Sequence, residues 1–329
     1  MKTPIALRLG APVLPAWPGI LALLLLALLG PGTALGFSEA NHKNLSRESV
    51  QYFQYRCDPK QRTWWADPII VARGSVGEDT YLRPSRLLNW HFYNPDTRLK
   101  RQKLGLANPT PSLYLKNAKE KIKRAIHARN PEMLSDGLGD FSHYIQDMAN
   151  PSHIAPHFHG GSKKDQFDIY PLPIEPALTL ELCNAVEARY LELYQGNHPA
   201  VDVDDLDRLI EDTASSTLSQ IQQTYSAHIN GKKAVRPWTD FWLKSKNGEF
   251  REYTESVLGN RFGKPRISAN TETLGERDSP CKKGHPCLFE IQAKDYEEFA
   301  ITQSNLAMTN TLVALRLVSD IYNQQVEMR

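Results

Sequence analysis

The stretch Ser-His-Tyr-Ile-Gln-Asp-Met-Ala-Asn-Pro-Ser-His, residues 142–153, carries the strongest signal in this chain. His143 and Asp147 lie four residues apart, so on a helix they share one face and can hold one cation. Pro151 ends that helix, and His153 follows where the chain can turn back toward the same site. Imidazole and carboxylate are ligands that Zn²⁺ accepts when it keeps an open position for water. The stretch therefore predicts a helix with a metal site near its C-terminal end.

A second stretch upstream adds another imidazole. Residues 90–96 read Trp-His-Phe-Tyr-Asn-Pro-Asp and place His91 beside aromatic residues. Taken with residues 142–153, they give the His and Asp composition of a metal site that can activate water and clamp phosphate oxygens.

Helical periodicity dominates the chain around these stretches, because apolar residues recur at intervals of three and four. No run of alternating apolar and polar residues predicts a strand. Two regions, 58–110 and 259–290, are rich in Pro, Gly and charged residues and are expected to form long loops. The sequence predicts an all-α fold, a single helical-bundle domain over residues 37–329 with ligands carried by long loops. The expected helices cover residues 43–56, 115–126, 131–149, 175–195, 206–225 and 299–321.

The N-terminus has the features of a secretory signal peptide. Lys2 and Arg8 precede an unbroken apolar run of ten residues at 20–29, which is too short to span a bilayer. Small residues stand before the expected cleavage point. Residues 1–36 are therefore expected to be removed, leaving a secreted or periplasmic protein that begins at Phe37.

Four cysteines follow the expected cleavage point, an even number that permits two disulfides in an exported chain. Cys281 and Cys287 bracket a short segment and are expected to staple a loop. Cys57 and Cys183 are then the remaining pair.

The motif His143-x3-Asp147-x5-His153, preceded by His91-Phe-Tyr-Asn-Pro-Asp, resembles the zinc-dependent phospholipase C and S1/P1 nuclease superfamily. The His-Phe-Tyr-x-Pro-Asp stretch is closer to the phospholipase C branch. The resemblance is strongest over residues 79–153. It implies an α-helical bundle that holds up to three zinc ions in a cleft and cleaves phosphodiesters.

The resemblance also implies a ligand set. The free amine and carbonyl of the first mature residue bind metal in this family, which prefers Trp where this chain has Phe37. Asp79 matches a metal-binding Asp that is also a candidate general base. The residues that match the first part of the family's site are Phe37, His42, Asp79, His91, His143, Asp147 and His153.

The second part of the site departs from the family pattern. Well-known members continue with a His-x3-Glu or His-x3-Asp pair, which this chain lacks after His153. His159 and Asp168 fit a variant pattern and are the preferred ligands. His157, Asp165 and Glu175 are the alternatives. The site then holds three zinc ions, or two where this departure removes one position.

The function implied is that of a secreted zinc metallohydrolase, with phospholipase C-type hydrolysis of phospholipids by zinc-activated water. Asp79 would position or deprotonate that water. The substrate is a phospholipid or other phosphodiester, transient contact with a membrane surface is compatible with it, and no stable protein partner is inferred. One alternative is a nuclease on single-stranded nucleic acid, which the short spacing from Phe37 to His42 favours and the net charge of only +2 disfavours. The other is a metal-binding homologue with weak or no catalysis.

Overall fold

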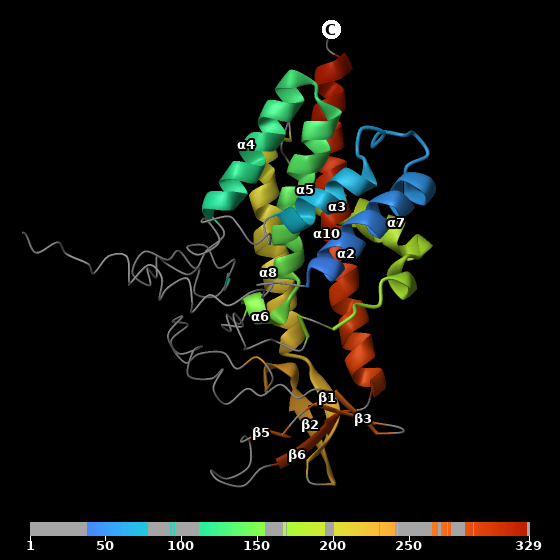
Figure 1. Ribbon diagram of the computed structural model, residues 1–329, viewed down its shortest axis with the longest axis vertical. Coiled ribbons are helices and arrows are strands. Elements are labelled where there is room, and N and C mark those ends of the chain that lie inside the picture. The colour runs from blue at the N-terminus through green and yellow to red at the C-terminus, as the bar shows by residue number, and fades with distance from the viewer. Residues whose placement is uncertain are drawn as a thin grey trace, which may run out of the picture.

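The structure of the chain is a computed structural model in which helices predominate (Figure 1). It describes residues 38–77, 93, 95, 112–154, 167–168, 170–194, 201–229, 231–240, 242, 265–268, 271–274, 276–277, 287–291 and 293–327. The expected signal peptide at 1–36 lies outside these residues.

A bundle of helices forms the main body of the molecule. The long helix α10 (Ala293–Glu327) runs along the bundle, as the orange-to-red helix in Figure 1 shows. It contacts α2, α5, α7 and α8. The other helices are α2 (Glu39–Tyr52), α3 (Pro68–Gly77), α4 (Ser112–Ala128), α5 (Pro131–Met148), α6 (Pro151–Ile154), α7 (Leu180–Tyr194) and α8 (Leu206–Ile221). A π-helical turn at Phe53–Cys57 and 3-10 turns at Glu175–Ala177, Val203–Asp205 and Trp238–Asp240 complete the helical elements of the described residues.

Local sequence explains where the helices at the site begin and end. Ser38 caps α2 by accepting a hydrogen bond from the Asn41 amide, and Asn130 caps α5 by accepting one from the Met133 amide. Pro131 is in the first turn of α5, where a backbone N–H would have no partner within the helix, and proline has none. Pro151 begins the short helix α6 after α5 has ended at Met148. The break expected at this proline is therefore present, and His153 lies two residues beyond it within α6.

The buried apolar side chains of the helices form one core. Leu45 on α2, Leu138 on α5 and Leu312 on α10 are each fully buried within it. Burial of apolar stripes from all the long helices is the main favourable contribution to folding such a bundle.

The expectation that the chain has no strands is wrong. The described residues form six short strands at the N-terminal end of α10 (Figure 1), joined mainly as an antiparallel sheet in the order β2-β1-β6-β4-β3, with β5 paired to β6. They are β1 (Thr224–Ile229), β2 (Lys232–Pro237), β3 (Pro265–Ser268), β4 (Thr271–Leu274), β5 (Glu276–Arg277) and β6 (Cys287–Ile291).

Several boundaries also differ from the expected ones. Residues 68–77, expected to be loop, form α3, and part of the 259–290 region forms strands β3 to β6. The predicted helix at 206–225 stops at Ile221, and Tyr225 belongs to β1. The helix predicted at 175–195 begins only at Leu180, after the 3-10 turn at Glu175–Ala177. The mostly helical class and the remaining predicted helices are confirmed.

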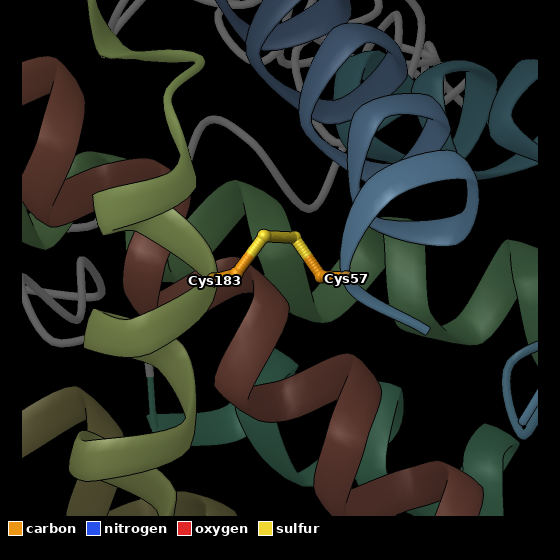
Figure 2. Close-up of a disulfide and its surroundings, with 2 residues drawn as sticks. All are labelled: Cys57 and Cys183. Carbon is orange, nitrogen blue, oxygen red and sulfur yellow. A yellow bond between two sulfur atoms is a disulfide. The ribbon is translucent and has the colours of Figure 1, made fainter. Parts of the chain in front are cut away.

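A disulfide joins Cys57, at the end of the π-helical turn, to Cys183 on α7 (Figure 2). Their Cα atoms are 5.2 Å apart, and the bond links positions 126 residues apart in the chain. This pairing was expected, whereas the predicted Cys281–Cys287 pair is not tested, because Cys281 lies outside the described residues. A structural disulfide is typical of proteins outside the cytoplasm. Among the described helices, none combines the length and apolar character that a membrane span requires.

Candidate metal centre

Three predicted ligands meet in the interior of the bundle. His42 comes from α2, and His143 and Asp147 come from consecutive turns of α5. One ligand atom from each lies within 4.8 Å of the other two, and all three side chains are fully buried. The helical spacing of His143 and Asp147 therefore has the consequence expected from the sequence, and the group can hold a metal ion.

The two imidazoles approach different oxygens of the Asp147 carboxylate. His42 Nε2 lies 3.3 Å from Asp147 Oδ1, and His143 Nε2 lies 3.2 Å from Asp147 Oδ2. The two rings stack on each other with centroids 4.3 Å apart. Each carboxylate oxygen thus faces its own ring nitrogen, an arrangement in which one carboxylate can serve two ions.

These separations fit metal ligands better than hydrogen-bonded ion pairs. A charge-assisted N–H···O bond is typically about 2.7–2.9 Å long, shorter than either of these contacts. Two ligand atoms bound at about 2.0–2.1 Å to a tetrahedral ion lie about 3.3 Å apart. The 3.2 and 3.3 Å distances from Asp147 match that tetrahedral edge.

The other nitrogen of each imidazole is held by an uncharged acceptor. His143 Nδ1 lies 2.8 Å from the backbone oxygen of Ser75 on α3, and His42 Nδ1 lies 2.7 Å from Gln146 Oε1. A carbonyl oxygen can only accept, so the Nδ1 atom of His143 carries the proton and donates it. In a neutral imidazole, Nε2 then bears the lone pair, as a metal ligand must. The donor set therefore fits zinc.

A close crossing of α3 and α5 makes the contact between Ser75 and His143. Gly74 on α3 and Gly139 on α5 face each other there, and a Cβ added to Gly139 would lie 2.7 Å from the Gly74 Cα and overlap the Val71 carbonyl oxygen. Backbone atoms cannot move aside as a flexible side chain can. Only glycine at this crossing lets the two helices approach closely enough for Ser75 to reach the imidazole.

The pKa of the Asp147 carboxyl is lowered despite its burial. Burial alone would raise its pKa, but the imidazoles of His143 and His153 and the contacts with His143 and His42 hold the pKa well below its usual value. A buried carboxylate facing imidazole nitrogens is the electrostatic environment expected of a cation site.

His153 lies beside the three-residue group. Its Nδ1 atom is 3.9 Å from Asp147 Oδ2, and its side chain is fully buried on α6. Its backbone oxygen accepts a hydrogen bond of 3.0 Å from the Tyr93 amide. The two motifs at 90–96 and 142–153 are thus joined in space, although His91 itself lies outside the described residues.

Asp168 is buried in a hydrogen-bonded network next to the end of α5. Its Oδ1 accepts a hydrogen bond from Asn150 Nδ2 at 2.9 Å. Its backbone oxygen accepts from the backbone amide of Ser38 and from Asn41 Nδ2, both at the start of α2. Asn150 follows Asp147 closely, and its backbone N–H donates to the Asp147 backbone oxygen at 2.9 Å. Asp168 is therefore close to the chain on both sides of the candidate centre, but it is not a member of the three-residue group.

The remaining site predictions are not placed by the structure. Phe37, Asp79, His91 and His159, with the alternatives His157 and Asp165, lie outside the described residues. Glu175, the other alternative, begins a 3-10 turn and is exposed.

Sequence reasoning missed Ser75 and Gln146. Ser75 acts through a backbone oxygen, for which no side-chain signal exists. Gln146 stands next to Asp147 inside the motif at 142–153, and this position was the only sign in the sequence that it contributes to the site.

Comparison of the chain with known proteins finds no matching family model, no matching curated protein and no matching solved structure. The likeness to the phospholipase C and S1/P1 nuclease superfamily rests on the two motifs at 90–96 and 142–153.

Proposed function

We propose that this protein is a secreted zinc-dependent hydrolase of phosphodiesters, with phospholipids as its substrates. One observation carries the proposal: His42 Nε2 and His143 Nε2 face opposite oxygens of Asp147 at the spacing of metal ligands, in a fully buried site. The disulfide between Cys57 and Cys183 and the expected signal peptide support the secreted location.

His42, His143 and Asp147 would hold the metal, and the two oxygens of Asp147 would allow it to bridge two ions. Zinc bound here would supply Lewis acidity, lowering the pKa of water and offsetting the charge that develops on phosphate oxygens. The Nδ1 atom of His143 contacts the Ser75 backbone oxygen, and the Nδ1 atom of His42 contacts Gln146 Oε1. Asp79 stays the predicted residue that positions or deprotonates the attacking water.

Phospholipids are favoured over nucleic acids by two features of the chain. The His91-Phe-Tyr-Asn-Pro-Asp stretch resembles the phospholipase C branch, and Tyr93 within it is hydrogen-bonded to His153 beside the cluster. A net charge of only +2 supplies little of the positive field by which proteins bind single-stranded nucleic acid. Cleavage on the glycerol side of the phosphate would leave diacylglycerol and a phosphorylated head group.

The test uses mature protein beginning at Phe37, assayed on phosphatidylcholine micelles and on single-stranded DNA, with its zinc content measured beforehand. We expect bound zinc and hydrolysis of the lipid, both lost in His143→Ala. Hydrolysis of DNA alone would replace the lipase proposal with the nuclease. Bound zinc without hydrolysis of either substrate would leave the metal-binding homologue, and absence of zinc would overturn the metalloenzyme proposal.

A second test concerns the predicted N-terminal ligand. One additional residue before Phe37 should lower the zinc content and the activity, because the free amine would no longer lie at the position that the resemblance implies. Unchanged zinc content and activity would remove Phe37 from the ligand set.

A further inference from the structure

Gln146 is a buried side chain whose amide is bound at both ends. Its Oε1 lies 2.7 Å from His42 Nδ1, and its Nε2 donates to Ser46 Oγ at 2.9 Å and lies 3.5 Å from Thr311 Oγ1. These contacts connect three helices, since Gln146 belongs to α5, Ser46 to α2 and Thr311 to α10. The two hydroxyls orient the amide so that its oxygen faces the imidazole.

We propose that Gln146 is a positioning residue of the metal centre, which fixes His42 in the tautomer with the proton on Nδ1 and directs Nε2 toward Asp147. The inference rests on the proposed metal site and extends it to a residue outside the ligand set. Gln146 immediately precedes Asp147, so one turn of α5 supplies both a ligand and the partner that orients a ligand from another helix.

The geometry explains why His42 needs such a partner more than His143 does. His143 shares helix α5 with Asp147 and donates to the backbone of α3, which the glycine crossing holds in place. His42 reaches Asp147 from a different helix, and its Nδ1 atom contacts a side chain, that of Gln146. The tautomer and ring orientation of His42 therefore depend on Gln146, whereas those of His143 depend on the packing of two backbones.

An amide also suits the site because it accepts a hydrogen bond without bringing a charge. The carboxylate of Asp147 already stands one residue away in a fully buried environment. A neutral acceptor satisfies the hydrogen bond of His42 Nδ1 and adds no further anion to be desolvated.

The test compares two substitutions of Gln146 in the full mature chain. Gln146→Leu removes the acceptor at similar volume, and we expect zinc affinity, measured by competition with a chelator, to fall by about 10–100-fold. Gln146→Glu keeps an acceptor beside Nδ1, and the hydroxyls of Ser46 and Thr311 can rotate to donate to its second oxygen. We expect its zinc affinity to stay within about 3-fold of wild type, well below the roughly 10–100-fold loss that removal of an outer partner produces.

Gln303→Leu is the matched control. Gln303 on α10 is also fully buried, and its side-chain amide donates to Gln220 Oε1 at 2.6 Å. This variant measures the cost of deleting a buried amide as such, so we expect it to lower the melting temperature and leave zinc affinity unchanged.

A measurement without metal tests the tautomer directly. Long-range ¹H–¹⁵N correlation spectra of the imidazoles report which nitrogen of His42 carries the proton. We expect Nδ1–H in the wild type and loss of this single tautomer in Gln146→Leu, with His143 unaffected.

The outcomes separate this inference from the proposed function. Zinc affinity and the His42 tautomer unchanged in Gln146→Leu would overturn the positioning role while the metalloenzyme stands. Zinc bound by the wild type without hydrolysis would overturn the enzyme and leave the positioning role to be decided by the variants. Failure of the wild type to bind zinc would overturn both.

Discussion

Two of the buried carboxylates in the described part of the chain, Asp58 and Asp147, are buried in different ways. Asp58 accepts hydrogen bonds of 2.7 Å from both the amide and the hydroxyl of Thr63 and lies 3.6 Å from Arg62 Nε. All of these partners come from within five residues of it. Asp147 instead faces the imidazoles of His42 and His143, which come from two different helices.

The chemistry of the partners separates a structural carboxylate from a ligand. Amide, hydroxyl and guanidinium groups are donors, so Asp58 is neutralised and solvated by its own turn. The imidazoles at Asp147 use Nδ1 to donate elsewhere, to Ser75 and Gln146, which leaves Nε2 on the side of the carboxylate. A buried charge needs compensation, and at Asp147 the proposed metal ion would supply it. Burial alone therefore does not mark a functional carboxylate, but the direction of the surrounding donors does.

The largest effect is expected when Asp147 loses its charge. Asp147→Asn should weaken zinc binding by more than the roughly 10–100-fold that loss of an outer-shell partner causes. The reason is that Asp147 would bind the metal directly, beside both His42 and His143, and the substitution removes its charge. Hydrolysis should disappear with the metal. Asp58→Asn is the matched control, and chelator competition should give it the zinc affinity of the wild type. Equal zinc affinities in Asp147→Asn and Asp58→Asn would break the comparison.

The next effect is on the stability of the folded chain. Free zinc at about 100 times its dissociation constant should stabilise the wild type by about 2.7 kcal/mol, since it binds the assembled site and not the separated ligands. Chemical denaturation with zinc and with excess chelator measures this difference. Asp58→Asn should keep the whole difference and Asp147→Asn should lose it. A zinc effect that survives in Asp147→Asn would locate the stabilising ion elsewhere.

The glycine crossing should matter to the same site from a distance. Gly139→Ala places a methyl group against the backbone of α3, and we expect a loss of about 1–3 kcal/mol from overpacking, together with weaker zinc binding as Ser75 moves away from His143. Urea denaturation and zinc titration measure the two effects.

Gly137→Ala is the control for that variant. Its added Cβ would come nearest to a side-chain atom, 3.1 Å from Ile122 Cγ1, which can shift. The gain in helix propensity, about 0.5–1 kcal/mol, should offset that strain and leave zinc binding intact. Zinc affinity preserved in Gly139→Ala would show that Ser75 does not depend on the close crossing.

The sequence predicted the parts of the site that are local and missed those that depend on packing. His143 and Asp147 share a helix, so their spacing alone places them on one face. Ser75 contributes a backbone oxygen, which every residue possesses, and its position depends on two glycines facing each other across a helix pair. Pro68 and Gly74 read as loop residues, yet the proline stands at a helix start and the glycine at a crossing.

The strands escaped prediction for a related reason. β1 pairs with β6, and the partners Ala227 and Ile291 are far apart in the chain. The strands β3 to β6 have two to five residues each. Segments this short carry little periodicity, and their stability comes from partners that a local pattern does not reveal.

The smallest effect is the pH-dependent contribution of Asp58 to the stability of the folded chain. The hydrogen bonds from Thr63 and the charge of Arg62 outweigh burial and lower the pKa of Asp58 below its ordinary 3.8. Its contribution to stability is therefore complete above that pH and disappears as the pH falls through the folded-state pKa. We expect Asp58→Asn to cost about 1 kcal/mol at neutral pH. The difference from wild type in urea denaturation should shrink below pH 3.8.

Asp204→Asn provides the comparison for that experiment. Asp204 pairs with Lys119 and Lys123 but its side chain is 61% exposed, so solvent screens the pairs and the loss should stay below about 1 kcal/mol. Adding salt should reduce the Asp204 effect and leave the Asp58 effect nearly unchanged, because the partners of Asp58 are buried hydrogen-bond donors at 2.7 Å. An Asp58 effect that falls with salt as the Asp204 effect does would mean that long-range charge, and not the donors of its turn, stabilises this carboxylate. Only the effect of zinc would then distinguish Asp147 from Asp58.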